Sequence, residues 1–250
     1  MKYTVITGAS TGIGREAAKE FAKRGKNLVV VARREAELES LKSEVKEINK
    51  ELDVIIKVSD LGKLENVYKL YEDLKSLDIE TWINNAGFGD RATIADVDLS
   101  KIHNMIALNI EALTVLSTLY IKDYENVEGT QLINISSAGG YTMIGDNVTY
   151  CATKFYVSAF TEGIAKELEF RGSKMKVKVL APAATETEFA INALDTKEFS
   201  YKEHMKKFHT ASEMAGFLLD LYDSEKVVGI VNGMTYEYNM VDPMFNHARR

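Results

Sequence analysis

The residues Thr7-Gly8-Ala9-Ser10-Thr11-Gly12-Ile13-Gly14 follow a short apolar run and open a helical pattern. The run before them, residues 3–7, has the length and composition of a buried strand. Glycine permits a tight turn, and main-chain N–H groups at a helix N-terminus favour a phosphate. The strand–turn–helix context, more than the glycines alone, indicates a site for the pyrophosphate of a dinucleotide. We expect this site to use Gly8, Ser10, Thr11, Gly12, Ile13 and Gly14.

Strand-like and helical patterns alternate along the rest of the chain. Seven strands are predicted, at residues 3–7, 27–32, 54–58, 82–83, 131–135, 177–181 and 227–231, with six helices among them. The two longest helices are predicted at about residues 100–121 and 150–170. Such alternation indicates βαβ units and a parallel sheet. The expected fold is α/β: a single Rossmann-like, doubly wound domain over residues 1–250, with a seven-stranded parallel sheet flanked by helices on both faces.

The second predicted strand ends at Ala32-Arg33-Arg34. A site for NAD commonly has an acidic residue here, which binds the 2′-hydroxyl of the ribose. A guanidinium group suits a 2′-phosphate instead, so Arg33 and Arg34 favour NADP(H) over NAD(H). The alternative is that both arginines only solvate the start of the next helix, although positive charge at that end opposes the helix dipole.

Tyr150 and Lys154 are four residues apart in a predicted helix, so they share one face. An ammonium group near a phenol is expected to lower the pKa of the phenol from about 10 toward neutrality. A tyrosine needs that property to act as a general acid or base. Ser137 lies thirteen residues before Tyr150, and this spacing favours it over the adjacent Ser136 as a third member of the site.

With these residues the chain resembles the classical short-chain dehydrogenase/reductase family over nearly its whole length. Besides the glycine loop, the resemblance rests on Asp60, Asn84-Asn85-Ala86-Gly87, Asn109, the set Ser137, Tyr150 and Lys154, and Pro182-Ala183-Ala184-Thr185-Glu186-Thr187. There are two departures. Pro182-Ala183 stands where the family usually has Pro-Gly, and residues 233–250 lack the Asp-Gly-Gly ending common in tetrameric members. A homodimer is therefore as open as a homotetramer.

The resemblance implies a role for each residue of the site. Ser137 would orient the carbonyl oxygen, and Tyr150 would donate the proton. Lys154 would hold the nicotinamide ribose and lower the tyrosine pKa, and Asn109 would help to hold a water in a proton relay. Residues 186–210 would form a small substrate lid. Further contacts with the cofactor are implied for Asp60, Leu61, Asn85, Ala86, Gly87, Tyr150, Lys154, Pro182, Ala183, Thr185 and Thr187.

The composition argues against several other kinds of protein. A net charge of −6 disfavours nucleic acid as a partner. The single cysteine, Cys151, excludes an internal disulfide and favours the reducing cytoplasm. The four histidines have no close-set partners, so no metal site is expected. The first apolar run is too short for a signal peptide, and no apolar run approaches the roughly 20 residues of a membrane span, so no membrane partner is expected.

These observations predict an oxidoreductase that transfers a hydride between NADP(H) and a carbonyl compound or secondary alcohol, with Tyr150 as general acid and base. The substrate is a small molecule; 3-oxoacyl, 3-hydroxy acid, hydroxysteroid and general carbonyl compounds all stay open. One alternative is a redox sensor that binds NADP(H) without turnover. Another is an isomerase or dehydratase on the same fold, although the extra C-terminal domain of the sugar-nucleotide epimerases is missing.

Overall fold

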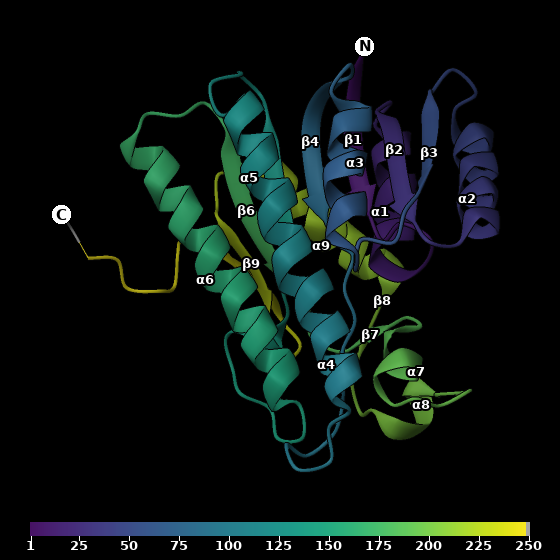
Figure 1. Cartoon of the computed structure of the whole chain (residues 1–250), viewed down its shortest axis with the longest axis vertical. Coiled ribbons are helices and arrows are strands. Elements are labelled where there is room, and N and C mark those ends of the chain that lie inside the picture. The colour runs from purple at the N-terminus through teal and green to yellow at the C-terminus, as the bar shows by residue number, and fades with distance from the viewer. Residues whose placement is uncertain (249–250) are drawn as a thin grey trace.

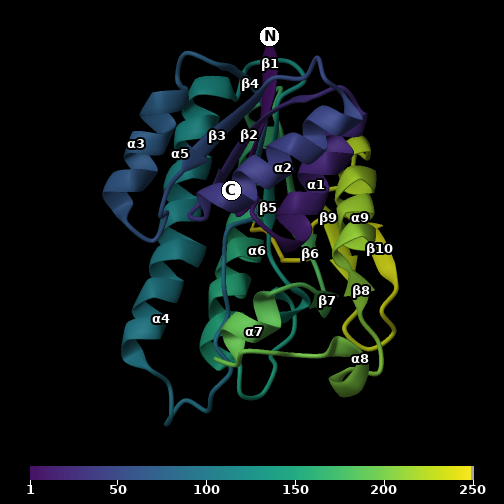
Figure 2. The same cartoon turned by 90° about the vertical axis from the view of Figure 1, so that its right-hand side faces the viewer.

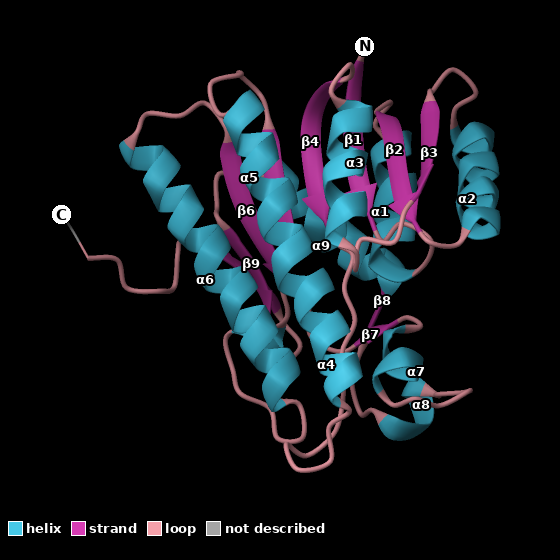
Figure 3. Ribbon diagram, viewed as in Figure 1, coloured by secondary structure: helices cyan, strands magenta, loops and turns pink. Residues whose placement is uncertain are grey.

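The computed structural model describes residues 1–248, which form an α/β fold with a central sheet between two layers of helices (Figures 1 and 3). In chain order the elements are β1 Lys2–Thr7, α1 Gly12–Lys23, β2 Asn27–Ala32, α2 Glu35–Ile48, β3 Val54–Val58, α3 Leu64–Leu74, β4 Asp78–Asn84, α4 Leu99–Ile106, a π-helical segment Ala107–Ala112, α5 Leu113–Tyr124, β5 Gln131–Ile135, a 3₁₀ turn Ala138–Gly140, α6 Val148–Phe170, β6 Lys176–Ala181, β7 Thr185–Glu186, α7 Phe189–Ala193, α8 Tyr201–His204, β8 His209–Thr210, α9 Ala211–Asp223, β9 Val228–Val231 and β10 Tyr238–Val241.

The strand order of the main sheet is β10-β9-β6-β5-β4-β1-β2-β3. All neighbouring strands are parallel except β10, which pairs antiparallel with β9. On one side of β1 lie β2 and then β3, and on its other side lie β4, β5 and β6 in that order. This reversal makes the carboxyl ends of β1 and β4 a topological switch point, where ligands bind in such sheets.

The prediction of seven strands is wrong by one, because the sheet has an eighth strand, β10, at its edge. Tyr238 pairs with Val231 across a short connection, and its ring stacks on Phe217 of α9 with 4.3 Å between ring centroids. The Tyr238 hydroxyl donates to the carbonyl oxygen of Phe217 (2.9 Å). A four-residue strand on an edge has a weak sequence pattern, and here its place depends on contacts with a helix distant in sequence.

The helices form two layers (Figure 2). On one face of the sheet, α1 packs against α2 and α9, and on the other α3 packs against α5. Each layer has its own apolar core: Phe21, Leu41 and Leu218 are fully buried in the first, and Trp82 and Tyr120 in the second. These cores hold the strands so that their carboxyl ends meet at one edge of the sheet.

The predicted helix at residues 100–121 runs from Leu99 to Tyr124 but is interrupted by the π-helical segment Ala107–Ala112. By length and composition this helix could cross a membrane, with a mean hydropathy of 1.4 over an 18-residue window. Buried helices of soluble proteins pass the same test. In this structure α5 lies against β4 and β5, with Leu116 and Tyr120 in the core.

Two segments lie outside the layers. Residues 185–210 form the strand pair β7 and β8 and the short helices α7 and α8, beyond the carboxyl ends of the main strands (Figure 1). Residues 242–248, which we call the C-terminal tail, run beside α6 (Figure 1). The first segment covers the region where the sequence predicts a lid.

Candidate active site

Ser137, Tyr150 and Lys154 come together at the carboxyl end of β5. Ser137 directly precedes the 3₁₀ turn Ala138–Gly140, while Tyr150 and Lys154 lie in the first two turns of α6. The Lys154 ammonium is 5.9 Å from the centroid of the Tyr150 ring and donates to the main-chain carbonyl oxygen of Ile135 (2.9 Å). The second turn of α6 is thereby tied to the end of β5, two residues before Ser137.

Ser136 and Ser137 differ in their environments. The Ser136 hydroxyl is buried, lies 2.7 Å from the Ser158 hydroxyl and donates to the Lys154 carbonyl oxygen (2.9 Å). The Ser137 hydroxyl accepts a hydrogen bond from the Gly139 N–H (3.1 Å) and lies 3.5 Å from the Pro182 carbonyl oxygen. It is also close enough to Tyr150 to counter the rise in the pKa of that phenol. The structure therefore brings Ser137, and not Ser136, to the tyrosine.

Protonation in this site departs from the simple expectation. Burial raises the pKa of Tyr150 to about 12, and the hydrogen bond with Ser137 opposes the rise. Burial also lowers the pKa of Lys154 to about 8. With the protein's own groups alone, the phenol stays protonated at neutral pH, because desolvation of the phenolate outweighs the hydrogen bond with Ser137.

Asn109 lies within the π-helical segment, and its side chain is buried. The amide donates to the Phe88 carbonyl oxygen (2.9 Å) and the Thr153 hydroxyl (3.1 Å), and the amide oxygen accepts from the Phe88 N–H (3.1 Å). Gly87 lies between Asn109 and Lys154, since a Cβ there would be 3.0 Å from Asn109 Oδ1 and 3.5 Å from Lys154 Nζ. Asn109 thus joins the site through the Gly87–Phe88 backbone. Single π turns in long helices are often functional.

The glycine loop has the backbone expected of a phosphate-binding turn. Gly8 and Gly12 have φ values of +65° and +59°, which favour glycine. A Cβ on Gly8 would lie 2.8 Å from Ala86 Cα, and a Cβ on Gly14 would collide with the side chain of Asn85. Thr11, the N-cap of α1, makes no side-chain cap hydrogen bond. The first turn of α1 can therefore offer N–H groups to an anion.

The segment after β4 supports this loop. Thr7 accepts hydrogen bonds from the N–H groups of Asn85 and Ala86 at its hydroxyl (3.0 Å each). The Asn85 side chain donates to the carbonyl oxygens of Thr7 (2.9 Å) and Gly8 (3.1 Å). The Asn85 side chain therefore supports the glycine loop from within the protein. Its amide donates to the loop backbone and is not free for a ligand.

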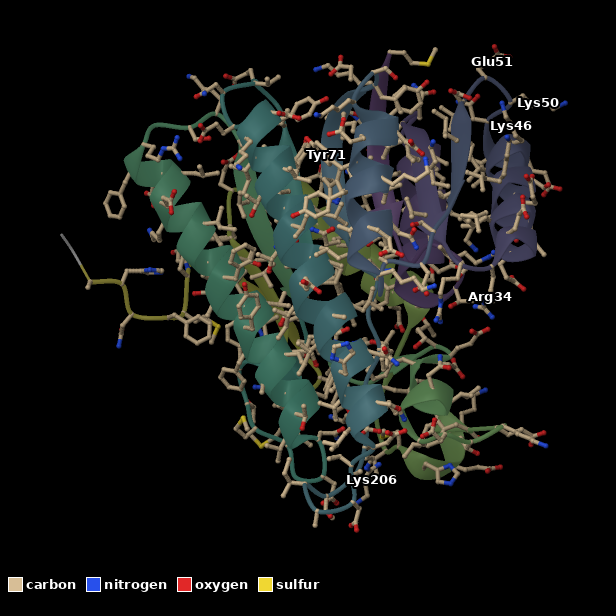
Figure 4. The ribbon with its side chains drawn as sticks, in the orientation of Figure 1. Arg34, Lys46, Lys50, Glu51, Tyr71 and Lys206 are labelled. Carbon is tan, nitrogen blue, oxygen red and sulfur yellow. The ribbon has the colours of Figure 1, made fainter. Side chains whose placement is uncertain are left out.

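Arg33 and Arg34 point to different partners. Arg33 lines a hollow of about 440 Å³ together with Asp60, Ser59 and Lys57. Leu61, the next residue, is buried in the second core. Arg34 instead pairs with Glu188, with 2.8 Å between Arg34 Nη2 and Glu188 Oε2, at the corner above α7 (Figure 4). The two arginines, adjacent in sequence, therefore have different surroundings.

The segment from Pro182 to Thr187 passes beside both halves of the site. The Pro182 carbonyl oxygen accepts from the Ala138 N–H (2.7 Å). The Thr185 hydroxyl donates to the carbonyl oxygen of Ala183 (2.9 Å). A Cβ on Gly12 would lie 2.8 Å from Thr187 Cγ2, so Thr187 contacts the glycine loop. This segment therefore links the loop to the turn after Ser137.

The comparisons with known proteins agree with this arrangement. Residues 2–198 match the family model for short chain dehydrogenases. An uncharacterized oxidoreductase from Staphylococcus saprophyticus is 31% identical over 198 residues, 78% of each chain. The human dehydrogenase/reductase SDR family member 11 is 29% identical over 200 residues, 78% of this chain and 77% of the other. A solved short-chain dehydrogenase from Sphingobium yanoikuyae in complex with NADPH has a TM-score of 0.83 at 28% identity, covering 92% of this chain and 87% of the other.

The chain belongs to the short-chain dehydrogenase family. It is an oxidoreductase of that family, and its α/β fold with a mostly parallel sheet is the fold of its relatives. Small molecules are the substrates of this family. Among residues 1–248, no three histidine, cysteine, aspartate or glutamate side chains are placed to hold a metal ion.

In this short-chain dehydrogenase, α7 lies over the N-terminal end of α6, where Tyr150 is found. The Phe189 ring lies against the Tyr150 ring, with 5.4 Å between centroids. A Cβ on Gly89 would be 2.6 Å from Phe189 Cζ, so the missing side chain at Gly89 makes room for this ring. The Lys101 ammonium pairs with Asp90 (2.9 Å) and Asp195 (2.7 Å), which joins the end of α7 to the segment after β4. The sequence motifs contain no signal for Gly89, Lys101 or Thr153.

Proposed function

We propose that this short-chain dehydrogenase is an NADP(H)-dependent carbonyl reductase or alcohol dehydrogenase. The observation that carries the proposal is the convergence of Ser137, Tyr150 and Lys154 at the carboxyl end of β5, the strand next to the switch point that β1 and β4 form. The relative from Sphingobium yanoikuyae, solved with NADPH, supports a nicotinamide cofactor. Asn109 lies next to the same site through the Gly87–Phe88 backbone.

The residues present fit a dinucleotide. The positive φ values of Gly8 and Gly12, together with the uncapped first turn of α1, suit a pyrophosphate. The hollow beside Asp60 would take the adenine end, and Arg33 at its rim supports NADP(H) over NAD(H) because a guanidinium binds a phosphate as a fork. The Pro182–Thr187 segment would lie along the nicotinamide end.

When bound, the reduced cofactor supplies the hydride. The protein supplies the proton and the orientation. Tyr150 holds a phenolic proton for the carbonyl oxygen that becomes the hydroxyl, and Ser137 offers a second hydrogen bond to the same oxygen. Lys154, charged below a pH of about 8, provides a positive charge near the phenol and a donor for a ribose hydroxyl.

The raised pKa of Tyr150 bears on the direction of the reaction. A phenol that is protonated at neutral pH is ready to act as an acid, as carbonyl reduction requires. Oxidation of an alcohol needs the phenolate, so it would gain from alkaline pH. The protein's own groups therefore favour reduction near neutrality.

The test is an assay of the purified protein with NADPH or NADH and a panel of aldehydes, ketones, 3-oxo esters and steroids. Loss of reduced-nicotinamide absorbance with NADPH is the expected result, and the best substrate would name the subclass. Tight NADPH binding without turnover would favour a redox sensor. Substrate conversion without net cofactor oxidation would favour an isomerase or dehydratase.

The proposal extends to the setting of the enzyme. Cys151 is buried and unpaired in the described chain, which is consistent with a reducing cytoplasm. The partner is a small carbonyl or alcohol molecule, and the oligomer is a homodimer or homotetramer. Light scattering of the purified protein would distinguish these two states.

A further inference from the structure

Glu162 is a buried carboxylate that the proposed reaction does not use. It lies on α6, two turns beyond Lys154, and is fully shielded from solvent. Its Oε1 accepts a hydrogen bond from the Tyr141 hydroxyl (2.6 Å). Its Oε2 accepts from the N–H groups of Met244 (2.7 Å) and Phe245 (2.9 Å) in the C-terminal tail. A buried charge needs such donors, so Glu162 fastens the tail to α6.

Aromatic contacts hold the tail at the same place. The Phe245 ring stacks on the Tyr141 ring, with 5.5 Å between centroids and 18° between planes. The Phe245 ring also lies near Phe155, the residue after Lys154, with 6.5 Å between centroids. Burial and the Glu162 carboxylate raise the pKa of Tyr141 well above its usual value, so its hydroxyl remains a donor. The tail thus stacks on Tyr141 and shares the Glu162 carboxylate with the hydroxyl of that tyrosine.

Tyr141 ends the short turn that begins at Ser137. The Gly140 N–H donates to the Ser137 carbonyl oxygen (2.8 Å), and the Tyr141 N–H donates to the Ala138 carbonyl oxygen (3.1 Å). The turn also packs tightly on α6, because a Cβ on Gly140 would lie 2.6 Å from the Lys154 carbonyl oxygen. A shift of Tyr141 would therefore be passed to Ser137 through a turn with little free space.

We propose that the C-terminal tail positions Ser137 for catalysis, acting through Glu162 and Tyr141. The inference rests on the proposed function, since it assigns Ser137 a part in the reaction. Phe245, Glu162 and Tyr141 are positioning residues in this scheme, because none of them touches the reacting atoms. The tail lies outside residues 2–198, which match the family model.

The first experiment compares a chain that ends at Pro243 with a control chain that ends at Ala248 and keeps the tail. Hydrogen exchange of the Gly139, Gly140 and Tyr141 amides should be at least about tenfold faster in the shorter chain, since their hydrogen bonds lose the support of the tail. The turnover number should fall about tenfold to a hundredfold, as a misplaced catalytic group would predict. NADPH affinity should stay within about twofold, because the tail does not contact the glycine loop.

Point variants keep the test valid if the shorter chain folds poorly. Phe245→Ala and Glu162→Gln should lower the turnover number and leave NADPH affinity unchanged, and Phe245→Tyr should restore turnover because it restores the stacked ring. Unchanged exchange in the Gly139–Tyr141 amides would overturn the proposal. A parallel fall in turnover, NADPH affinity and melting temperature would also overturn it, since that pattern means general destabilisation.

Hydrogen exchange also separates this inference from the proposed function. If the full chain shows no turnover with any carbonyl substrate, the proposed function fails, and with it the catalytic meaning of the tail. Faster exchange in the shorter chain would then still show that the tail orders the turn after Ser137. If the full chain reduces a carbonyl substrate and the shorter chain has the same turnover number, only the inference about the tail fails.

Discussion

The rings of Phe189 and Tyr150 lie against each other with 5.4 Å between their centroids, although the residues are 39 positions apart in the chain. Phe189 belongs to the short helix α7, and it reaches the tyrosine because Gly89 has no side chain to block it. The face of the phenol is thus partly covered by an apolar ring. The segment after β6 therefore determines how much room a substrate has beside the Tyr150 phenol.

Replacing this ring should change which substrates are accepted. We expect Phe189→Ala to raise kcat/KM for bulky ketones relative to small ones by about tenfold, since the cavity it opens lies beside Tyr150. Phe199→Ala is the matched control, because Phe199 packs on Tyr201 within the same segment. Measurement of kcat/KM over a series of ketones of growing size checks this. A uniform loss for all substrates would contradict a role in selection.

Tyr150→Phe should lower turnover by about 10²- to 10⁴-fold, because only the group that carries the proton is removed. NADPH affinity should not change. Tyr156→Phe is the control on the same helix, since the Tyr156 hydroxyl lies 2.9 Å from the Thr114 hydroxyl near the surface. Steady-state kinetics and fluorescence titration with NADPH provide both values. Full activity in Tyr150→Phe would remove this residue from the mechanism.

Arg33→Ala should weaken NADPH binding by about tenfold or more and leave NADH binding nearly unchanged, because a charge-assisted fork to the 2′-phosphate is lost. Arg34→Ala should have the smaller effect on NADPH, since Arg34 already pairs with Glu188. Titration of both variants with both cofactors tests the distinction. Equal losses for NADPH and NADH in Arg33→Ala would show that Arg33 does not bind the phosphate.

The pH profile of kcat/KM for reduction should fall as pH rises past about 8, where Lys154 loses its proton. Tyr150 would remain protonated there, because its pKa is about 12. Lys154→Arg keeps the charge and should lose the fall near pH 8, at a lower overall rate. A wild-type profile that stays level to pH 10 would mean that the charge of Lys154 is not needed.

Two buried lysines should respond in opposite ways to the same replacement. Burial lowers the pKa of both Lys154 and Lys178 to about 8. Each buried charge therefore lowers the free energy of unfolding at neutral pH. This cost is relieved as the pH rises from about 8 toward about 10.4, the pKa of a lysine in the unfolded chain. Lys178, however, donates to the carbonyl oxygens of Leu221, Tyr222 and Ser224 at the end of α9, each at 2.7 Å.

We therefore expect Lys154→Met to raise the free energy of unfolding by about 1 kcal/mol while it reduces activity, because it removes a buried charge and loses only one hydrogen bond, to the Ile135 carbonyl oxygen. Lys178→Met should lower it by about 2–3 kcal/mol, because it leaves buried carbonyl groups without donors. Urea unfolding at pH 7 measures both. A loss of stability in both variants would show that Lys154 has a structural role as well.

Several features of the site could be predicted from sequence because each depends on neighbours along the chain. The glycine loop is a local turn between a strand and a helix, and the Tyr150–Lys154 spacing is a property of one helix. The strands of the parallel sheet could be found from their apolar runs. The edge strand β10 could not, since its place depends on Phe217 and β9.

The sequence by itself determined the family, the α/β fold, the glycine loop and the identity of the serine, tyrosine and lysine of the site. Only the tertiary structure decided that Arg34 pairs with Glu188, that Phe189 covers Tyr150, and that Glu162 holds the C-terminal tail. The physical reason is the range of the interactions. Motifs record bonds and turns within a few residues, whereas burial, pairing of charges and pKa shifts arise between groups that meet only when distant segments pack together.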